Sequence, residues 1–268
     1  PLGMIGRSID AKSHVIHIKN FNLLQIDHCF RDDLSINVNP IFDGLAAALG
    51  SLSKDDQDLG VMFIDVGADK TNMLLYKDNY LIHSKVIPIG SKSVTKDIAA
   101  YLQTSIKRAE LIKHEHVSAL SDFADPESNF ELPIENDDLT KSINQKEISE
   151  IAELRYEDII DQIKSEMKLL RMDISDIRSG IKITGGGSNV RNLDLLFKKH
   201  FEDTKCEYLS ISNTVFKENL EDRRELSTLI GLLSWPIFNT EDSSPTVGVK
   251  NFKSITKNIS SIWKGFFE

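Results

Sequence analysis

"FIDVGADKT" (residues 63–71) joins an apolar run to a turn that contains glycine, and the architecture predicted for this chain depends on it. The run "GVMFIDVG" (60–67) predicts a buried strand that ends near Asp65, turns at Gly67 and continues as a second strand near Asn72. Such a corner can direct several backbone N–H groups at one point, which suits a phosphate, and glycine permits close approach of a ligand. Asp65 would then face a bound Mg²⁺, directly or through water. The alternative is a plain hairpin turn with an exposed aspartate, because short motifs also recur by chance.

A second glycine cluster lies in "IKITGGGSNVRNLDLLFKKHF" (181–201), where Gly185, Gly186 and Gly187 separate a predicted strand from a predicted helix. Glycines at this point would let the backbone approach the planar ring or the sugar of a ligand. The alternative is a flexible connection, although three adjacent glycines cost much conformational entropy. A dinucleotide fingerprint would need glycine where the chain has Val190, so that motif fails here.

The remaining segments alternate between strand and helix patterns, which predicts an α/β protein. The stretch 121–146 is polar and acidic, contains two prolines, and is predicted to be a long loop. Further strands are predicted over 13–18, 35–40, 72–76, 80–90 and 207–211, those at 72–76 and 80–90 forming a hairpin. Helices are predicted over 21–34, 41–52, 94–120, from Ile148 onward, over 189–201 and through 229–235.

Composition narrows the class of protein. The chain has 268 residues, which is long enough for more than one domain. Its net charge of −9 makes nucleic acid an unlikely partner. Cys29 and Cys206 are the only cysteines, which favours a reducing, cytosolic compartment over a disulfide framework. No apolar run approaches the ~18 residues of a membrane-spanning helix, and no secretory signal opens the chain. The opening "PLGM" is either native sequence or the scar of an expression tag.

The C-terminal segment "SITKNISSIWKGFFE" (254–268) follows a polar linker and has the opposite character to the rest of the chain. In a helix its apolar residues would form one face with lysines beside it, which predicts a helix lying in a membrane surface. The alternative is a terminal helix that binds protein, either this chain's own core or a partner. The predicted membrane-binding residues are Phe252, Ile255, Ile259, Ile262, Trp263, Phe266 and Phe267, with Lys253, Lys257 and Lys264.

These segments together resemble the FtsA family of cell-division proteins, within the actin/Hsp70-like ATPase superfamily. The resemblance covers nearly the whole chain and rests on their order and spacing more than on any one motif. The segments are "LGVMFIDVGADKTNMLLYKDNYLIHSKVIPIGSKSVTKDIA" (59–99 without a gap), "LQTSIKRAELIKHEHVSAL", "ISEIAELRYEDIIDQI", "IKITGGGSNVRNLDLL", "STLIGLL" and the opening "PLGMIGRSIDAKSHVIHI".

The resemblance implies an actin-like (ribonuclease H-like) nucleotide-binding fold in which only part of the family's length is present. Subdomains 2A and 2B would be complete, and 1C and 1A would be represented in part. The implied divisions are the end of 1C (1–38), a return segment of 1A (39–58), 2A in two parts (59–91 and 179–238), 2B (92–178), a linker (239–250) and a membrane-targeting helix (251–268).

The resemblance also implies a site for ATP and Mg²⁺, the metal lying beside Asp65. Phosphates would be bound by Asp65, Gly67, Ala68, Asp69, Lys70 and Thr71, and adenosine by Glu153, Arg155, Gly185, Gly186, Gly187 and Ser188. The family commonly has Asp-(Ile/Met)-Gly-Gly-Gly-Thr at the phosphate turn, whereas this chain keeps one glycine of three. Asp69 would repel phosphate. We therefore expect no catalytic residue and weak ATPase activity at most, and poor nucleotide binding by this portion alone.

The function implied is that of a membrane-anchored adaptor rather than an enzyme. It would tether the FtsZ ring to the cytoplasmic membrane at the septum through 92–178, recruit later division proteins and self-associate into actin-like filaments. Two alternatives share the fold: a phosphotransferase or phosphatase such as a sugar kinase, and a pilus-assembly relative of FtsA. The first would require a general base, and the sequence offers no clear candidate.

Overall fold

The structure is a computed structural model, and it describes residues 7–8, 10, 13–34, 39–133, 140–202, 204–209, 211 and 223–238. Contacts divide the chain into two units, Pro1–Leu232 and Leu233–Glu268, and the packing described below lies within the first. The predicted linker, the predicted membrane-binding helix and most of the strand predicted over 35–40 lie outside the described residues.

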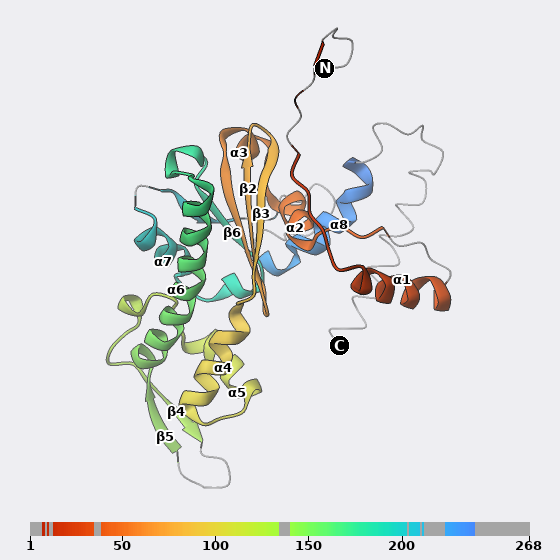
Figure 1. Cartoon of the computed structure of the whole chain (residues 1–268). Coiled ribbons are helices and arrows are strands. Elements are labelled where there is room, and N and C mark those ends of the chain that lie inside the picture. Colours follow the sequence, from red (N-terminus) through yellow and green to blue (C-terminus); the bar gives the residue numbers. More distant parts are fainter. Residues whose placement is uncertain are drawn as a thin grey trace. The chain divides into compact units, whose positions relative to one another are not determined.

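A five-stranded mixed sheet forms the centre of the first unit (Figure 1). Strand β1 pairs antiparallel with β2 and parallel with β6, β2 pairs antiparallel with β3, and β6 pairs parallel with β7. The order β3-β2-β1-β6-β7 places β1 in the middle, and all of its residues are buried. The strands are β1 (Val61–Val66), β2 (Thr71–Lys77), β3 (Tyr80–Ile87), β6 (Ile181–Thr184) and β7 (Cys206–Tyr208).

Alternate residues of β1 enter two separate hydrophobic clusters, because successive side chains in a strand point to opposite faces. Met62 and Ile64 belong to the cluster that includes helix α6 (Gln145–Leu170). Val61 and Phe63 belong to the cluster that includes helix α2 (Asp43–Ser51). Asp65 continues the second series, so its carboxylate lies on the α2 side of the sheet.

A second group of elements follows the hairpin along the chain and packs with the beginning of α6 (Figure 1). It contains α4 (Ser91–Leu102), α5 (Ile106–His116), the 3-10 turn η1 (Ser121–Phe123) and strands β4 (Asn129–Pro133) and β5 (Thr140–Asn144). The prediction of a long loop over 121–146 was therefore wrong. Strands β4 and β5 pair as an antiparallel two-stranded sheet, and only Leu132 and Ile143 are buried in them, so the surrounding polar residues obscured the pattern.

The strand predicted over 13–18 is also wrong. These residues have no regular secondary structure and are exposed, with Val15 at 72% and Ile18 at 53%. A strand needs a neighbour to satisfy its backbone groups, and in the described part of the chain this segment pairs with none. His14 attaches it to β3, with Nε2 2.8 Å from the Ser84 hydroxyl and the ring centroid 5.9 Å from that of His83. Helix α1 (Asn20–Leu34), which follows, confirms the helix predicted over 21–34.

The other helices agree with the sequence with small shifts. α7 (Leu193–His200) begins later than predicted, because the 3-10 turn η3 (Gly186–Asn189) comes between β6 and the helix. Among the described residues, no helix is long and apolar enough to cross a membrane. The remaining elements are α3 (Lys54–Leu59), η2 (Ile174–Asp176), η4 (Arg224–Leu226) and α8 (Ser227–Phe238).

Helices α2 and α8 meet backbone to backbone at two glycines. A Cβ added to Gly231 would lie 1.7 Å from the Ala46 carbonyl oxygen, and one added to Gly50 would lie 2.2 Å from the Ser227 carbonyl oxygen. The absence of side chains at these positions therefore fixes how close the two helices approach.

We predict that Gly231→Ala lowers the free energy of unfolding by at least ~1–3 kcal/mol, the usual cost of overpacking, because the helices must separate to admit a methyl group. Leu229→Ala on the exposed side of α8 is the matched control and should change stability much less. Urea unfolding followed by circular dichroism measures both. Equal stability of Gly231→Ala and the unsubstituted chain would contradict the close contact.

Candidate functional site

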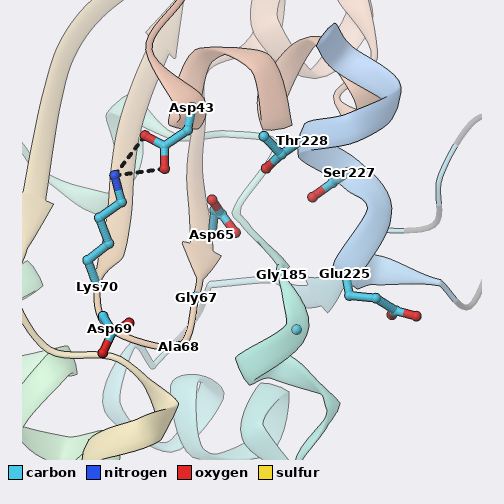
Figure 2. Close-up of a pocket in the computed structure, with 11 residues that line it drawn as sticks. Asp43, Asp65, Gly67, Ala68, Asp69, Lys70, Gly185, Glu225, Ser227 and Thr228 are labelled. Atoms are coloured by element: carbon cyan, nitrogen blue, oxygen red, sulfur yellow. Dashed lines mark hydrogen bonds and ion pairs between the residues drawn. The ribbon is translucent and has the colours of Figure 1, made fainter. Parts of the chain in front are cut away.

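A pocket of about 370 Å³ lies at the edge of the sheet where β1 and β6 end. Its size falls within the range of small-molecule sites. Both glycine-bearing turns contribute to it, as does the beginning of α2 and of α8 (Figure 2). The lining residues are Asp43, Asp65, Gly67, Ala68, Asp69, Lys70, Gly185, Gly186, Glu225, Ser227 and Thr228.

The turn between β1 and β2 is attached to the first turn of α4. The N–H of Ser91 donates to the Gly67 carbonyl oxygen at 3.0 Å, and the N–H of Lys92 donates to the Ala68 carbonyl oxygen at 2.8 Å. Within the turn, the N–H of Gly67 donates to the Lys70 carbonyl oxygen at 2.9 Å. The carbonyl groups of Gly67 and Ala68 therefore point toward α4 and are satisfied there, whereas that of Lys70 is satisfied within the turn.

The N–H groups of Ala68 and Asp69 have a different status. Within the part of the chain that the structure describes, neither donates to a protein acceptor. Successive N–H groups in a turn can form a concave site for an anion. Thr71, predicted beside them as a phosphate ligand, is instead fully buried, and its hydroxyl donates to the Ile89 carbonyl oxygen at 2.8 Å.

Asp65 shares a polar cluster with residues from three elements. The Asn72 side-chain amide on β2 donates to Asp65 Oδ2 at 3.0 Å and to Asp43 Oδ2 at 3.4 Å. Lys70 Nζ lies 2.7 Å from Asp43 Oδ2 and 2.9 Å from Asp43 Oδ1 (Figure 2). Lys70 is thus already paired, and Asp43, which the sequence interpretation missed, supplies a second carboxylate beside Asp65.

Burial raises the pKa of Asp65, and the charge of Asp43 raises it further, while the hydrogen bond from Asn72 and the charge of Lys70 lower it. A raised carboxyl pKa means that ionisation of Asp65 opposes folding as the pH rises through the folded-state pKa. A cation bound beside Asp65 would reduce this cost. The neighbouring Asn72 Oδ1 is buried and has no hydrogen-bond partner among the described residues.

The three glycines of the second turn have two different roles. A Cβ at Gly185, whose φ is +89°, would lie 2.4 Å from Asp65 Oδ1, and one at Gly187 would lie 2.8 Å from the Val66 carbonyl oxygen. Both glycines therefore allow this turn to pack against the end of β1. Gly186 differs, since a Cβ there would meet only Glu225 Cβ at 3.4 Å and would project into the pocket.

Gly187 does not line the pocket, and neither do three other predicted adenosine residues. Ser188 is fully buried, and its hydroxyl donates to the Gly185 carbonyl oxygen at 2.7 Å. Glu153 accepts hydrogen bonds at 2.8 Å from the Ser121 N–H and from Lys199. Arg155 donates to Asp97 at 2.6 Å. Contact of these side chains with adenosine stays a prediction, and each already has a partner within the chain.

The side of the pocket opposite Asp65 comes from the segment before and within α8. Glu225 is held by Arg223 at 2.5 Å and by the Asn189 side chain at 3.3 Å. Burial opposes its ionisation, but these hydrogen bonds outweigh that effect and lower its pKa. Ser227 and Thr228 complete this side. Nothing local in the sequence distinguished these residues from an ordinary helix beginning.

The pocket has more carboxylates than cations. Asp43, Asp65, Asp69 and Glu225 line it, with Lys70 as the one basic lining residue that the structure describes. No group of three or more histidine, cysteine, aspartate and glutamate residues is placed to hold a metal ion by itself in the described part of the chain. A metal here would therefore need further ligands from a bound molecule or from water.

Comparison with known proteins identifies the chain's relatives. A sequence model of the family described as "Cell division protein FtsA" matches residues 62–231. The FtsA of Pseudomonas aeruginosa is 31% identical over 197 residues, which are 71% of this chain and 45% of that protein. The FtsA of Escherichia coli K12 is 27% identical over 246 residues, which are 88% of this chain and 57% of that protein. The chain thus spans about half the length of these curated relatives.

Solved structures show the same fold at lower identity. MreB5 of Spiroplasma citri bound to ADP superposes with a TM-score of 0.64 at 20% identity, over 91% of this chain and 68% of that chain. The PilM–PilN type IV pilus biogenesis complex gives a TM-score of 0.58 at 15% identity, over 78% and 56%. The predicted actin-like α/β fold is therefore confirmed.

The two roles of the glycines lead to a prediction that needs no ligand. Gly185→Ala should destabilise the chain by at least ~1–3 kcal/mol, because it introduces both a left-handed backbone cost and an overlap with Asp65. Gly186→Ala is the matched control, adds no overlap and should change stability by no more than ~0.5–1 kcal/mol. Thermal unfolding measures both variants. A Gly186→Ala chain less stable than Gly185→Ala would contradict the assigned roles.

Proposed function

The chain belongs to the FtsA family of actin-like cell-division proteins, and from this premise we propose that it contributes the ATP site of a membrane-anchored adaptor. The adaptor tethers the FtsZ ring to the cytoplasmic membrane at the septum and recruits later division proteins. Because the chain spans about half the length of its relatives, this proposal concerns the complete protein.

The observation that supports ATP most directly is the meeting of the two glycine-bearing turns in one pocket. One turn offers the N–H groups of Ala68 and Asp69, which have no acceptor among the described residues and suit a phosphate. The other offers Gly186, whose missing side chain leaves room for a ring or a sugar. A nucleotide needs both features, whereas a free phosphate would need only the first.

The residues present fit a nucleotide bound together with a divalent cation better than a nucleotide alone. Four carboxylates line the pocket, and they would repel a polyphosphate that carried no metal. Mg²⁺ takes one or two carboxylates together with phosphate oxygens and water, and Asp65 is the best-placed ligand. The raised pKa of Asp65 and the unsatisfied Asn72 Oδ1 beside it both favour a bound cation or its water. When bound, the metal would neutralise phosphate charge.

The same residues support an adaptor more than an enzyme. Lys70 would have to leave Asp43, 2.7 Å away, before it could contact a phosphate. Asp69 extends from the turn with a solvent-exposed carboxylate that would repel the phosphate from that side, and Lys92 Nζ, 3.3 Å away, offsets part of its charge. Among the described residues that line the pocket there is no histidine, so the carboxylates are the groups left to activate water, and none of them has a partner that marks it as a general base. We therefore propose ATPase activity that is weak at most.

Contacts with other proteins are proposed from the family alone. Residues 92–178 would bind FtsZ, and copies of the chain would associate into actin-like filaments. The segment 251–268 would bind the membrane through its apolar residues and lysines. These proposals place the complete protein at the cytoplasmic face of the inner membrane.

We predict that the complete protein binds ATP with Mg²⁺ and that Asp65→Asn weakens binding by about 10–100-fold, the usual effect of changing a group that orients a metal. Asp55→Asn, an exposed carboxylate on α3, is the matched control and should leave affinity unchanged. Isothermal titration calorimetry with and without Mg²⁺ measures the affinity. Metal-independent binding that is equal in both variants would refute the proposed arrangement.

A second prediction concerns the membrane. The complete protein should pellet with vesicles that contain phosphatidylglycerol, and these vesicles should then recruit FtsZ polymers. A chain that ends at Thr240 should do neither, because it lacks the predicted helix.

Charge reversal provides the control for this experiment. At ~1 kcal/mol for each lysine near anionic lipid, loss of the three lysines of the segment should reduce vesicle binding by about two orders of magnitude, and their replacement by glutamate should reduce it further. The same replacement of three exposed lysines elsewhere changes net charge equally and should have little effect. If the Thr240 truncation pelleted as well as the complete protein, the anchor would be ruled out. The segment's lysines are Lys253, Lys257 and Lys264, and the control lysines are Lys54, Lys96 and Lys107.

A further inference from the structure

Lys113 on α5 is buried to an unusual degree for a lysine, with 2% of its side chain exposed. Lysine is almost never fully buried unless it is paired. Its ammonium nitrogen lies 2.8 Å from both carboxylate oxygens of Glu110, 3.0 Å from the Thr95 hydroxyl oxygen and 3.4 Å from the Ser91 carbonyl oxygen. Its hydrogen bonds therefore join α5 to the first two turns of α4.

The position of the Lys113 ammonium group is unfavourable for the free energy of folding. The N-terminal end of a helix carries a partial positive charge, so the first turn of α4 disfavours a buried cation beside it, although the last turn of α5, in which Lys113 itself lies, favours one. A buried ion pair is often no more stable than a well-packed apolar pair. Glu110 compensates, since burial raises its pKa but the hydrogen bonds from Lys113 and Thr95 outweigh that and keep it ionised. Stability alone gives little reason for a lysine here, which points to a role in geometry.

The first turn of α4 connects Lys113 to the pocket. Ser91 accepts from Lys113 through its carbonyl group and donates through its N–H to the Gly67 carbonyl oxygen at 3.0 Å. Beside it, Gly90 packs so closely on the pocket turn that a Cβ would lie 2.4 Å from the Ala68 carbonyl oxygen. A displacement of the first turn of α4 must therefore displace Gly67 and Ala68.

We propose that Lys113 is a positioning residue for nucleotide binding: it holds the first turn of α4 so that the N–H groups of Ala68 and Asp69 face the pocket. The inference rests on the proposed ATP site and adds a residue that does not contact the ligand. It also identifies a connection between the segment 92–178 and the pocket. Any partner that moves α5 changes nucleotide affinity, and by thermodynamic reciprocity the nucleotide changes the affinity for that partner.

The test compares ATP affinity in the complete protein and in its Lys113→Met variant, which keeps the length of the side chain but removes the charge and the donors. We expect the dissociation constant for ATP with Mg²⁺ to rise on the order of tenfold, a size typical of residues that act at a distance. Lys96→Met, an exposed lysine on α4, is the matched control and should not change it. Amide hydrogen exchange of Ser91 and Lys92 should quicken in Lys113→Met only.

Two further variants separate positioning from stability. Glu110→Gln removes the counter-charge from a side chain that is 42% exposed, so the protein should fold and bind ATP more weakly. The double variant Lys113→Met with Glu110→Leu replaces the ion pair by an apolar pair, and it should regain thermal stability without regaining ATP affinity. A purely structural lysine would instead show affinity recovering together with stability.

The outcomes also distinguish this inference from the proposed function. If the unsubstituted complete protein failed to bind ATP, the proposed ATP site would fail. If it bound ATP and both Lys113→Met and Glu110→Gln bound equally well, the ATP site would stand and the positioning role would be overturned. Should Lys113→Met not fold, Glu110→Gln and the double variant decide the question by the same measurement.

Discussion

The contact between the end of β1 and the glycine turn after β6 is the constraint on which the site depends. Because β1 and β6 are parallel neighbours, their C-terminal ends lie at one edge of the sheet, where ligands of open α/β sheets bind. The two turns can meet there only if the second has no side chain at Gly185, since a Cβ would lie 2.4 Å from Asp65 Oδ1. Asp43 and Glu225 then close the pocket from α2 and from the segment before α8.

Charge imposes a second constraint on this pocket. Desolvation raises the pKa of Asp65, and the nearby Asp43 raises it further, so an ionised Asp65 is electrostatically unfavourable in this pocket. Lys70 compensates only Asp43 directly, and Asn72 has one donor group to offer to two carboxylates. A cation that bound beside Asp65 would relieve this unfavourable interaction. For this reason we propose a metal–nucleotide complex, rather than the nucleotide alone, as the ligand of the pocket.

The sequence predicted the local elements of the site, but it did not predict which distant residues folding brings to the pocket. The strand around Asp65 and the glycine turn were predicted from apolar runs and glycines, and the family resemblance supplied the expectation that they meet. Asp43 and Glu225 were missed because each is a single acid at the beginning of a helix, where acids are common for local reasons. The strand predicted over 13–18 fails for the converse reason, since its alternation is real but it has no partner strand in the described part of the chain.

Helix α4 could influence ligand binding indirectly, through the turn between β1 and β2. A helix N-terminus commonly binds phosphate through its own free N–H groups, but here those of Ser91 and Lys92 are used by the carbonyl groups of Gly67 and Ala68. The N–H groups left for an anion therefore belong to the turn, and α4 would act on a bound phosphate only by holding that turn in place. Since the opposite side of the same helical turn is held by Lys113, the geometry of the proposed phosphate site would be set partly from within the segment 92–178. In a protein that uses this segment to bind a partner, these hydrogen bonds from Lys113 through α4 to the turn would make nucleotide binding and partner binding interdependent without any shared residue.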